Sequence, residues 1–168
     1  ALEKAGVDMV HIIGKGMGHR FDAASKVEIE RRISAIAARG RERVPRRVVF
    51  TTHTLRYNKM RWVRVDALEK HWRRTDIMAQ MKEGDVIEVQ PKGVGAFTLQ
   101  FGPGECPLLF PKVQIGSSII KGLPPRRSDH SWEVHFRQED NRWRQTDSPH
   151  AKGLAKRHGL QGPIDDAF

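Results

Sequence analysis

The chain has 168 residues, of which 30 are Lys or Arg and 20 are Asp or Glu, so its formal net charge is +10. This length corresponds to one domain with short appendages, and a hydrophobic share of 38% supports one small core rather than a large buried catalytic cavity. No apolar run approaches the roughly 18 residues of a membrane-spanning helix. The single Cys106 excludes an intramolecular disulfide and a cysteine-based zinc site, and it favours a reducing compartment.

Residues 1–44 predict an N-terminal extension with one helix. Apolar residues recur at spacings of three and four over about 22–39, Asp22 is the expected N-cap, and Gly40 is the expected stop. The first residue is Ala1, and no charged segment followed by an apolar stretch comes after it. We therefore expect no secretory signal in this sequence.

A glycine-rich stretch, GKGMG at 14–18, lies between an apolar run at 9–13 and the predicted helix. Free backbone N–H groups at such a position can hold a phosphate. The stretch matches neither the P-loop pattern nor the dinucleotide pattern, because His19 stands where the last glycine would be. We interpret it as a turn or as a contact to an RNA backbone.

Residues 45–110 predict a small antiparallel β-barrel. Short segments of β-branched and alternating apolar residues follow one another, separated by turns that contain Gly and Pro and by a longer polar connection at 66–84. Several short strands at roughly ten-residue spacing are typical of a barrel. The predicted strands cover residues 48–55, 60–68, 85–90 and 96–102. The predicted fold class is therefore mainly β, an OB-like antiparallel barrel with an N-terminal helix and extended flanks.

Residues 111–168 predict a C-terminal extension that is partly strand-like and then extended. One or two short strands are expected within 110–120, and one more at 130–136. From Gln138 onward, apolar residues are too sparse to form a core. We expect this segment to order only against a partner, through the anchors Trp143, Leu154, Leu160, Ile164 and Phe168.

Positive charge is densest at residues 56–74, where seven basic residues face only two acidic ones, a local net charge of +5. Tyr57, Trp62 and Trp72 are interleaved with these cations. Cations beside flat aromatic faces suit phosphate neutralisation and base stacking, although a solvated face around core aromatics has the same composition. The predicted RNA-binding residues are Arg56, Tyr57, Lys59, Arg61, Arg64, Lys70, His71, Arg73, Arg74, Lys82 and Lys92.

Catalytic and metal-binding motifs are absent from the sequence. The eight histidines include no HxxxH or HExxH pair, and no nucleophile signature surrounds Cys106. We therefore expect no enzyme activity, metal, cofactor, membrane or small-molecule substrate. An enzyme that binds a nucleotide through residues 14–18 remains the third hypothesis.

Residues 48–101 resemble the seventeenth protein of the small ribosomal subunit. The resemblance lies in the order of features: a first strand, a Lys-Met turn at Lys59 that feeds a basic strand, and a His with a basic cluster at His71. A K-x-G-D-V-I-x-V strand at 82–89 follows, and Pro91 and Lys92 precede a closing strand. The sequence departs from the family after the Lys-Met turn and around Asp76, and it lacks the Ser-Lys that follows the proline.

This resemblance implies a five-stranded OB-type barrel that binds small-subunit ribosomal RNA. The flanking segments are additions that organellar ribosomal proteins often carry, which implies the mitochondrial matrix. The expected partners are ribosomal RNA and neighbouring ribosomal proteins. The alternative is an RNA-binding subunit of an organellar RNA-processing or editing complex, which the same barrel would serve.

Overall fold

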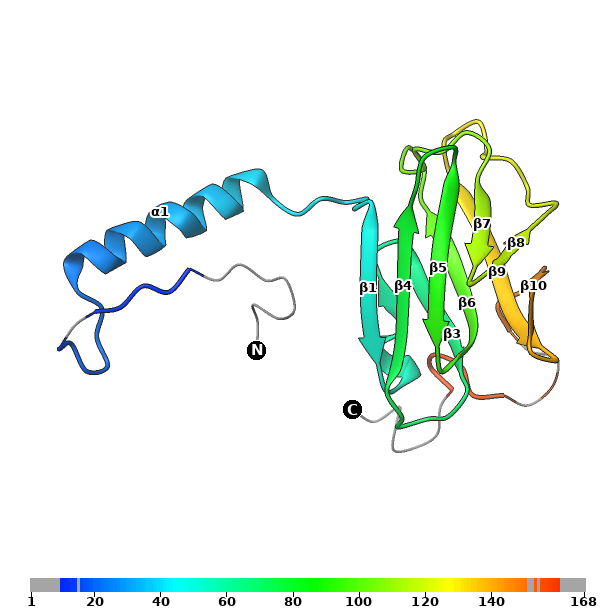
Figure 1. The fold of residues 1–168 in the computed structure, drawn as a ribbon, viewed down its shortest axis with the longest axis horizontal. Helices are drawn as coiled ribbons and strands as arrows, with labels where there is room; N and C mark the ends of the chain where they lie inside the picture. The colour runs from blue at the N-terminus through cyan, green and yellow to red at the C-terminus, as the bar shows by residue number, and fades with distance from the viewer. Residues whose placement is uncertain (1–9, 15, 151–152, 154, 161–168) are drawn as a thin grey trace. The chain divides into compact units, whose positions relative to one another are not determined.

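The computed structural model describes residues 10–14, 16–150, 153 and 155–160 (Figure 1). The chain divides into two compact units, Ala1–Glu42 and Arg43–Phe168. In the described residues the first unit contains the helix α1 (Ala23–Arg39), and the second contains the strands and a short 3₁₀ helix, η2 (Leu55–Tyr57).

Both ends of α1 are set by the residues that the sequence indicates. The side chain of Asp22 accepts a hydrogen bond from the Ser25 N–H at 2.8 Å. Gly40 adopts φ 65°, a left-handed conformation that glycine adopts at low cost, and its N–H donates to the carbonyls of Ile36 and Ala37. The predicted helix is therefore confirmed, including its N-cap and its stop.

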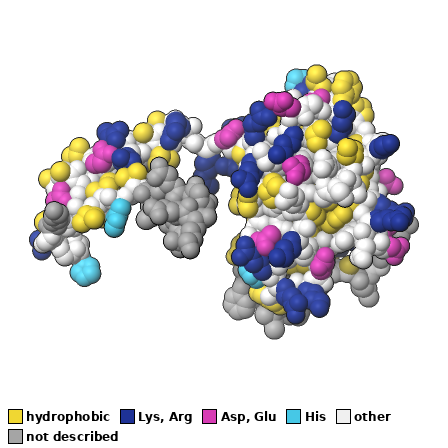
Figure 2. All heavy atoms as spheres, viewed as in Figure 1, with side chains coloured by type: hydrophobic (Ala, Val, Ile, Leu, Met, Phe, Trp, Pro, Cys, Tyr) yellow, Lys and Arg dark blue, Asp and Glu magenta, His cyan; other side chains and the backbone are white. Residues whose placement is uncertain are grey.

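The apolar residues of α1 are exposed. Val27, Ile33 and Ile36 are each at least 60% exposed, and the space-filling view shows hydrophobic side chains along the helix surface (Figure 2). Ser25 is the one buried residue of α1. The helix therefore contributes no buried apolar side chain to a core.

The second unit is a sandwich of two five-stranded sheets (Figure 1). Every pairing between neighbouring strands is antiparallel except that of β5 with β7. In spatial order the first sheet consists of β1 (Arg47–Thr52), β4 (Thr75–Met81), β5 (Val86–Lys92), β7 (Lys112–Ile115) and β8 (Ser118–Ile120). The second sheet consists of β10 (Arg142–Thr146), β9 (Trp132–Glu139), β6 (Val94–Phe101), β3 (Val63–Leu68) and β2 (Lys59–Met60).

The mainly β prediction is confirmed, but the described strands form two separate sheets rather than the predicted OB-like barrel. Among the described strands, β1 and β8 remain edges of the first sheet, and β2 and β10 remain edges of the second. A barrel requires a hydrogen-bonded ladder that closes on itself. Alternating apolar residues are equally compatible with a barrel and with a sandwich, so the pattern could not distinguish them.

Three strand predictions differ from the structure. The segment predicted as one strand at 60–68 is a hairpin of β2 and β3, and its turn holds Arg61 at φ 54°. The polar connection predicted at 66–84 contains β4, whose residues alternate between buried and half-buried positions. The segment after Gln138, predicted to order only against a partner, contains the end of β9 and all of β10.

Strands β7 to β10 lie within the predicted C-terminal extension, yet they supply strands to both sheets. Trp143 is half-buried, and its ring lies 5.1 Å from that of Phe97. Trp143 is therefore an anchor into the chain's own core rather than into a partner. Leu160 is 57% exposed, while Leu154, Ile164 and Phe168 lie outside the described residues.

The core fills the space between the two sheets and is rich in aromatic side chains. Phe97 stacks on Phe136 with ring centroids 5.1 Å apart, and Phe101 stacks on Trp62 at the same distance. The indole N–H of Trp62 donates to the Pro45 carbonyl at 2.8 Å, so this buried tryptophan keeps its polar atom satisfied. Trp62 is therefore a core residue and not part of an RNA-binding face.

Ile87→Asp tests the inward orientation of β5. Ile87 is 0% exposed, so a buried unpaired carboxylate should lower the free energy of unfolding by about 3 kcal/mol or more. The matched control is Val49→Asp, which places the same side chain at a 60% exposed position of β1 in the same sheet and should change stability by about 1 kcal/mol or less. Urea denaturation measures the free energy of unfolding of both variants, and equal values would contradict the inward orientation of Ile87.

Candidate nucleic-acid interface

The antiparallel registers place the loops of the sandwich at two opposite ends. β1 and β3 both finish where β4 and β6 begin, so residues 53–57, 69–74 and 92–93 meet at one end. β6 finishes at the opposite end, where β3 and β9 begin. The predicted RNA-binding residues are divided between these ends and the outer faces of the sheets.

Hydrogen bonds join the three segments at the first end. The Trp72 N–H donates to the His53 carbonyl at 2.9 Å, and the Glu69 N–H donates to the Gly93 carbonyl at 3.0 Å. The Thr75 hydroxyl also donates to the Gly93 carbonyl, at 3.2 Å. The loop between β3 and β4 is therefore fixed against both neighbouring segments.

Two large aromatic side chains extend into solvent at this end. Tyr57 is 69% exposed and Trp72 is 64% exposed. Trp72 adopts φ 62°, a left-handed conformation that is unusual for a bulky residue. With the surrounding basic residues they form a surface that we call the aromatic end. It consists of Arg56, Tyr57, Lys70, Trp72, Arg73, Arg74 and Lys92.

The cations of the aromatic end differ in their partners. Arg74 Nε lies 3.0 Å from the carboxylate of Asp76. The pKa of Asp76 is lowered, first by a hydrogen bond from the Thr51 hydroxyl and then by Arg74 and Lys92. Within the described chain, Lys70 and Arg73 form no side-chain ion pair. These two cations are therefore available to phosphates.

Of the remaining predicted site residues, His71 lies in the loop of the aromatic end and is half-buried. The others lie elsewhere. Lys59 and Arg61 are at the opposite end, where both line a surface groove. Lys82 pairs with Glu88 at 3.2 Å on the first sheet. Arg64 is held within a network on the second sheet. The structure therefore does not gather the predicted residues into one surface.

Trp72 is the residue that the predicted set omits. The only sequence feature that could have indicated it is a tryptophan between the cations Lys70 and Arg73, within the predicted polar connection at 66–84. Its backbone conformation and its exposure are consequences of the turn that joins the two sheets, so the sequence pattern alone could not distinguish it from the buried Trp62.

A hydrogen-bonded polar network crosses the outer face of the second sheet. Arg64 Nε donates to Asp66 Oδ1 at 2.8 Å, and its Nη2 donates to the Thr98 hydroxyl at 3.2 Å. The Thr98 hydroxyl lies 2.5 Å from Asp66 Oδ2 and 2.7 Å from His135 Nδ1. The network therefore links β3, β6 and β9, and it occupies the guanidinium group of Arg64.

The network fixes the tautomer of His135. The Thr98 hydroxyl has one proton, which it donates to the Asp66 carboxylate, so its oxygen must accept from His135. His135 therefore carries its proton on Nδ1, and Nε2 has a lone pair 3.9 Å from Glu133 Oε1. Burial lowers the pKa of His135 below its usual value of 6.5 and outweighs the neighbouring carboxylates. The imidazole is neutral at pH 7.

Nucleophilic chemistry is not supported at Thr98 or Cys106. Thr98 is 0% exposed, so its hydroxyl is closed to a substrate. Cys106 is also buried, and burial raises the pKa of its thiol. In the described part of the chain, no group of three or more His, Cys, Asp or Glu side chains could hold a metal ion.

The N-terminus of α1 is already occupied by a carboxylate. Asp22 accepts hydrogen bonds from both the N–H and the hydroxyl of Ser25, and these bonds lower its pKa. An incoming phosphate would have to displace Asp22 from this position. The arrangement therefore gives the nucleotide hypothesis no support. Lys15, in the glycine-rich stretch, lies outside the described residues.

No protein-family model, curated protein or solved structure matches the chain. Among the described helices, none has the length and apolar character needed to cross a membrane.

The lowered pKa of His135 predicts a pH-dependent stability. Below about pH 6.5 the unfolded chain binds a proton at this residue that the folded chain does not bind, so stability should fall as pH drops through this value. Groups facing His135 are Glu133, Asp66, Arg64 and His150. Urea titrations from about pH 8 to about pH 5 measure the effect.

His135→Gln is the control, because it removes the titrating group while it keeps a side chain that can donate to Thr98. The difference in stability between the two proteins should change with pH and should level off above about pH 7. Parallel pH profiles for the two proteins would contradict the assignment.

Proposed function

We propose that the chain is an RNA-binding module that holds single-stranded RNA at the aromatic end. The observation that carries the proposal is the exposure of Tyr57 and Trp72 on segments joined by hydrogen bonds and surrounded by cations. Bases stack on exposed aromatic rings, while Lys and Arg neutralise the phosphates between them. A strongly basic chain, with a net charge of +10, also favours association with a polyanion.

Single strands fit this surface better than duplexes do. The rings of Tyr57 and Trp72 project from loop segments, and a duplex has its base faces stacked internally, out of reach of such rings. Lys70 and Arg73 flank Trp72 in the sequence, so phosphates on either side of a stacked base would meet a cation. The cluster carries five basic residues, with Glu69 and Asp76 as the nearest acidic residues in sequence.

The more specific proposal is a structural role in a mitochondrial small ribosomal subunit. Its support is the resemblance over residues 48–101, while the open sandwich departs from the barrel of that family. The alternative is a subunit of an organellar RNA-processing or editing complex. Crosslinking in cells and sequencing of the bound RNA separates them, since ribosomal RNA supports the first, and guide or messenger RNA supports the second.

Trp72→Ala tests the aromatic contribution. The loss of one stacked base should weaken binding of a single-stranded RNA of about ten nucleotides by roughly 5- to 150-fold, which corresponds to about 1 to 3 kcal/mol. Fluorescence anisotropy at fixed salt measures the affinity, with a duplex of the same length for comparison. Trp72→Phe, which keeps a ring, should retain most of the affinity. Equal affinities for all three proteins would refute stacking at this residue.

Lys70→Gln combined with Arg73→Gln tests the phosphate contacts. The slope of log affinity against log salt should become shallower by about 0.7 for each lost contact with a single strand. The matched control replaces Arg47 and Lys112, which are exposed at the opposite end of the first sheet, and it should leave the slope unchanged. Equal slopes for both double variants would place the RNA elsewhere.

A further inference from the structure

A segment near the C-terminus is hydrogen-bonded to the aromatic end. His158 Nδ1 lies 2.8 Å from the backbone carbonyl oxygen of Leu55, the first residue of η2. A carbonyl oxygen only accepts, so Nδ1 carries the proton and donates this hydrogen bond. Leu55 is 0% exposed, so the accepting carbonyl belongs to a residue that is fixed in the core. Figure 1 shows the segment around His158, in red, at the end of the sandwich where β1 finishes.

Residues 155–160, which we call the C-terminal turn, form a short reversal of the chain. The Arg157 N–H donates to the Leu160 carbonyl at 3.3 Å, and the Leu160 N–H donates to the Arg157 carbonyl at 2.9 Å. Gly159 allows the reversal with φ 75°, a left-handed conformation. Side chains of directly opposed residues project to the same side, and Leu160 is 57% exposed. The side chain of Arg157 is exposed on that side as well.

The C-terminal turn and the loop that carries Trp72 are bonded to the same short segment, which leads into η2. The Trp72 N–H donates to the His53 carbonyl, and His158 donates to the Leu55 carbonyl. The two accepting residues are two positions apart, so at most about 7 Å of chain separates them. Tyr57 follows two positions later. The two exposed rings and the C-terminal turn are therefore all held by one short stretch of backbone.

The C-terminal turn brings positive charge to this end without any carboxylate. Residues 148–160 contain Lys152, Lys156 and Arg157 and no acidic residue. Lys156 and Arg157 directly precede His158, so the hydrogen bond of His158 to η2 holds both cations next to the aromatic end. In the part of the chain that the structure describes, Arg157 forms no side-chain ion pair. Its charge is therefore available to a phosphate.

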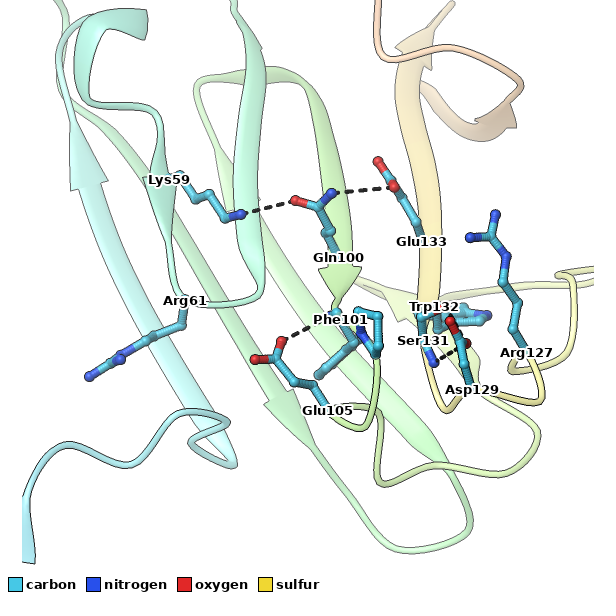
Figure 3. A pocket seen from close by; sticks show the side chains of 12 residues that line it. Lys59, Arg61, Gln100, Phe101, Glu105, Arg127, Asp129, Ser131, Trp132 and Glu133 are labelled. Carbon is cyan, nitrogen blue, oxygen red and sulfur yellow. Dashed lines mark hydrogen bonds between the residues drawn. The ribbon is translucent and has the colours of Figure 1, made fainter.

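The opposite end of the sandwich has a different balance of charge. A surface groove there is lined by three cations, Lys59, Arg61 and Arg127, and also by three carboxylates (Figure 3). Lys59 donates to the side-chain oxygen of Gln100 at 3.0 Å, and the Gln100 amide donates to Glu133 at 3.3 Å. A polyanion would meet repulsion from the carboxylates in this groove. The C-terminal turn, which has none, is the better continuation for a strand of RNA.

We infer that the C-terminal turn is part of the RNA-binding surface, and that a single strand stacked on Tyr57 continues along η2 so that its phosphates contact Lys156 and Arg157. The inference rests on the proposed function, because it extends the same site. Lys and Arg bind phosphates through charge-assisted hydrogen bonds. His158 is a positioning residue in this arrangement, because its hydrogen bond to Leu55 keeps the two cations beside the exposed rings.

Lys156→Gln combined with Arg157→Gln tests the phosphate contacts of the C-terminal turn. For a single-stranded RNA of about ten nucleotides, the slope of log affinity against log salt should become shallower by about 0.7 for each lost contact. The matched control, Arg47→Gln with Lys112→Gln, removes the same charge at the opposite end of the first sheet and should keep the slope of the parent chain. Equal slopes for the two double variants overturn the inference.

His158→Leu tests the positioning role. Without the hydrogen bond to Leu55 the C-terminal turn should detach from η2, so the salt slope should fall to that of the Lys156 and Arg157 double variant. His158→Asn is the matched control, because its side-chain amide can donate to the same carbonyl, and it should restore the slope of the parent chain. A parent-like slope for His158→Leu overturns the positioning role. Thermal unfolding shows whether each variant is folded.

Trp72→Ala, measured beside these variants, separates failure of this inference from failure of the proposed function. RNA binding that is weakened by Trp72→Ala but keeps its salt slope in the C-terminal variants supports the proposed function and overturns the inference. A change of slope in the C-terminal variants with unchanged binding by Trp72→Ala supports the inference and refutes stacking at Trp72. A parent chain that binds no single-stranded RNA overturns both.

Discussion

Burial of apolar side chains between two sheets is the interaction on which the structure of the second unit depends. β6 is central to it, because it pairs with both β3 and β9 and because Phe97, Leu99 and Phe101 are each at most 2% exposed. Phe97 contacts an aromatic side chain on β9 and another on β10. Strands from residues 47 to 146 thus contribute to one core, and the loops between them acquire fixed positions.

The two ends of the sandwich follow from this packing but differ in chemistry. At one end, three loop segments present exposed rings and cations that have few partners. At the other end, Glu105, Asp129 and Glu133 already accept hydrogen bonds, and within the described residues the side chains of Arg61 and Arg127 have no such partner. The aromatic end carries a surplus of cations, whereas Lys59, Arg61 and Arg127 at the other end lie with three carboxylates, so the two ends differ in net charge as well as in exposed aromatic side chains.

The outer face of the second sheet shows why a basic residue in a strand is not automatically a ligand contact. Arg64 is surrounded by Asp66, Thr98 and Glu133, with its side chain 23% exposed. Removing it from this network would leave a buried carboxylate without its cation, which is costly. The same network fixes the tautomer of His135, while burial keeps its imidazole neutral at pH 7. Its main consequence is a rigid connection across three strands.

Local chemistry in the sequence determined the helix, with its cap at Asp22 and its stop at Gly40, and the mainly β character of the second unit. It also placed Ile87 and Val89 on the same face of one strand, because side chains alternate between the two faces, while the structure showed that this face points inward. These features depend on residues that are close together in the sequence, so a local sequence pattern is enough to predict them.

Only the tertiary structure decided between a barrel and a sandwich, because closure depends on which distant strands pair and alternation is the same in both. It also decided which of two tryptophans in one basic segment is buried and which is exposed. Trp62 enters the core beside Phe101, whereas Trp72 lies at the tip of a turn between sheets. Trp143 was read as part of a partner-dependent tail, because the apolar partner that buries it, Phe97, lies 46 residues earlier in the chain. The burial of a side chain depends on such contacts between residues far apart in the sequence, so the composition of a short segment cannot predict it.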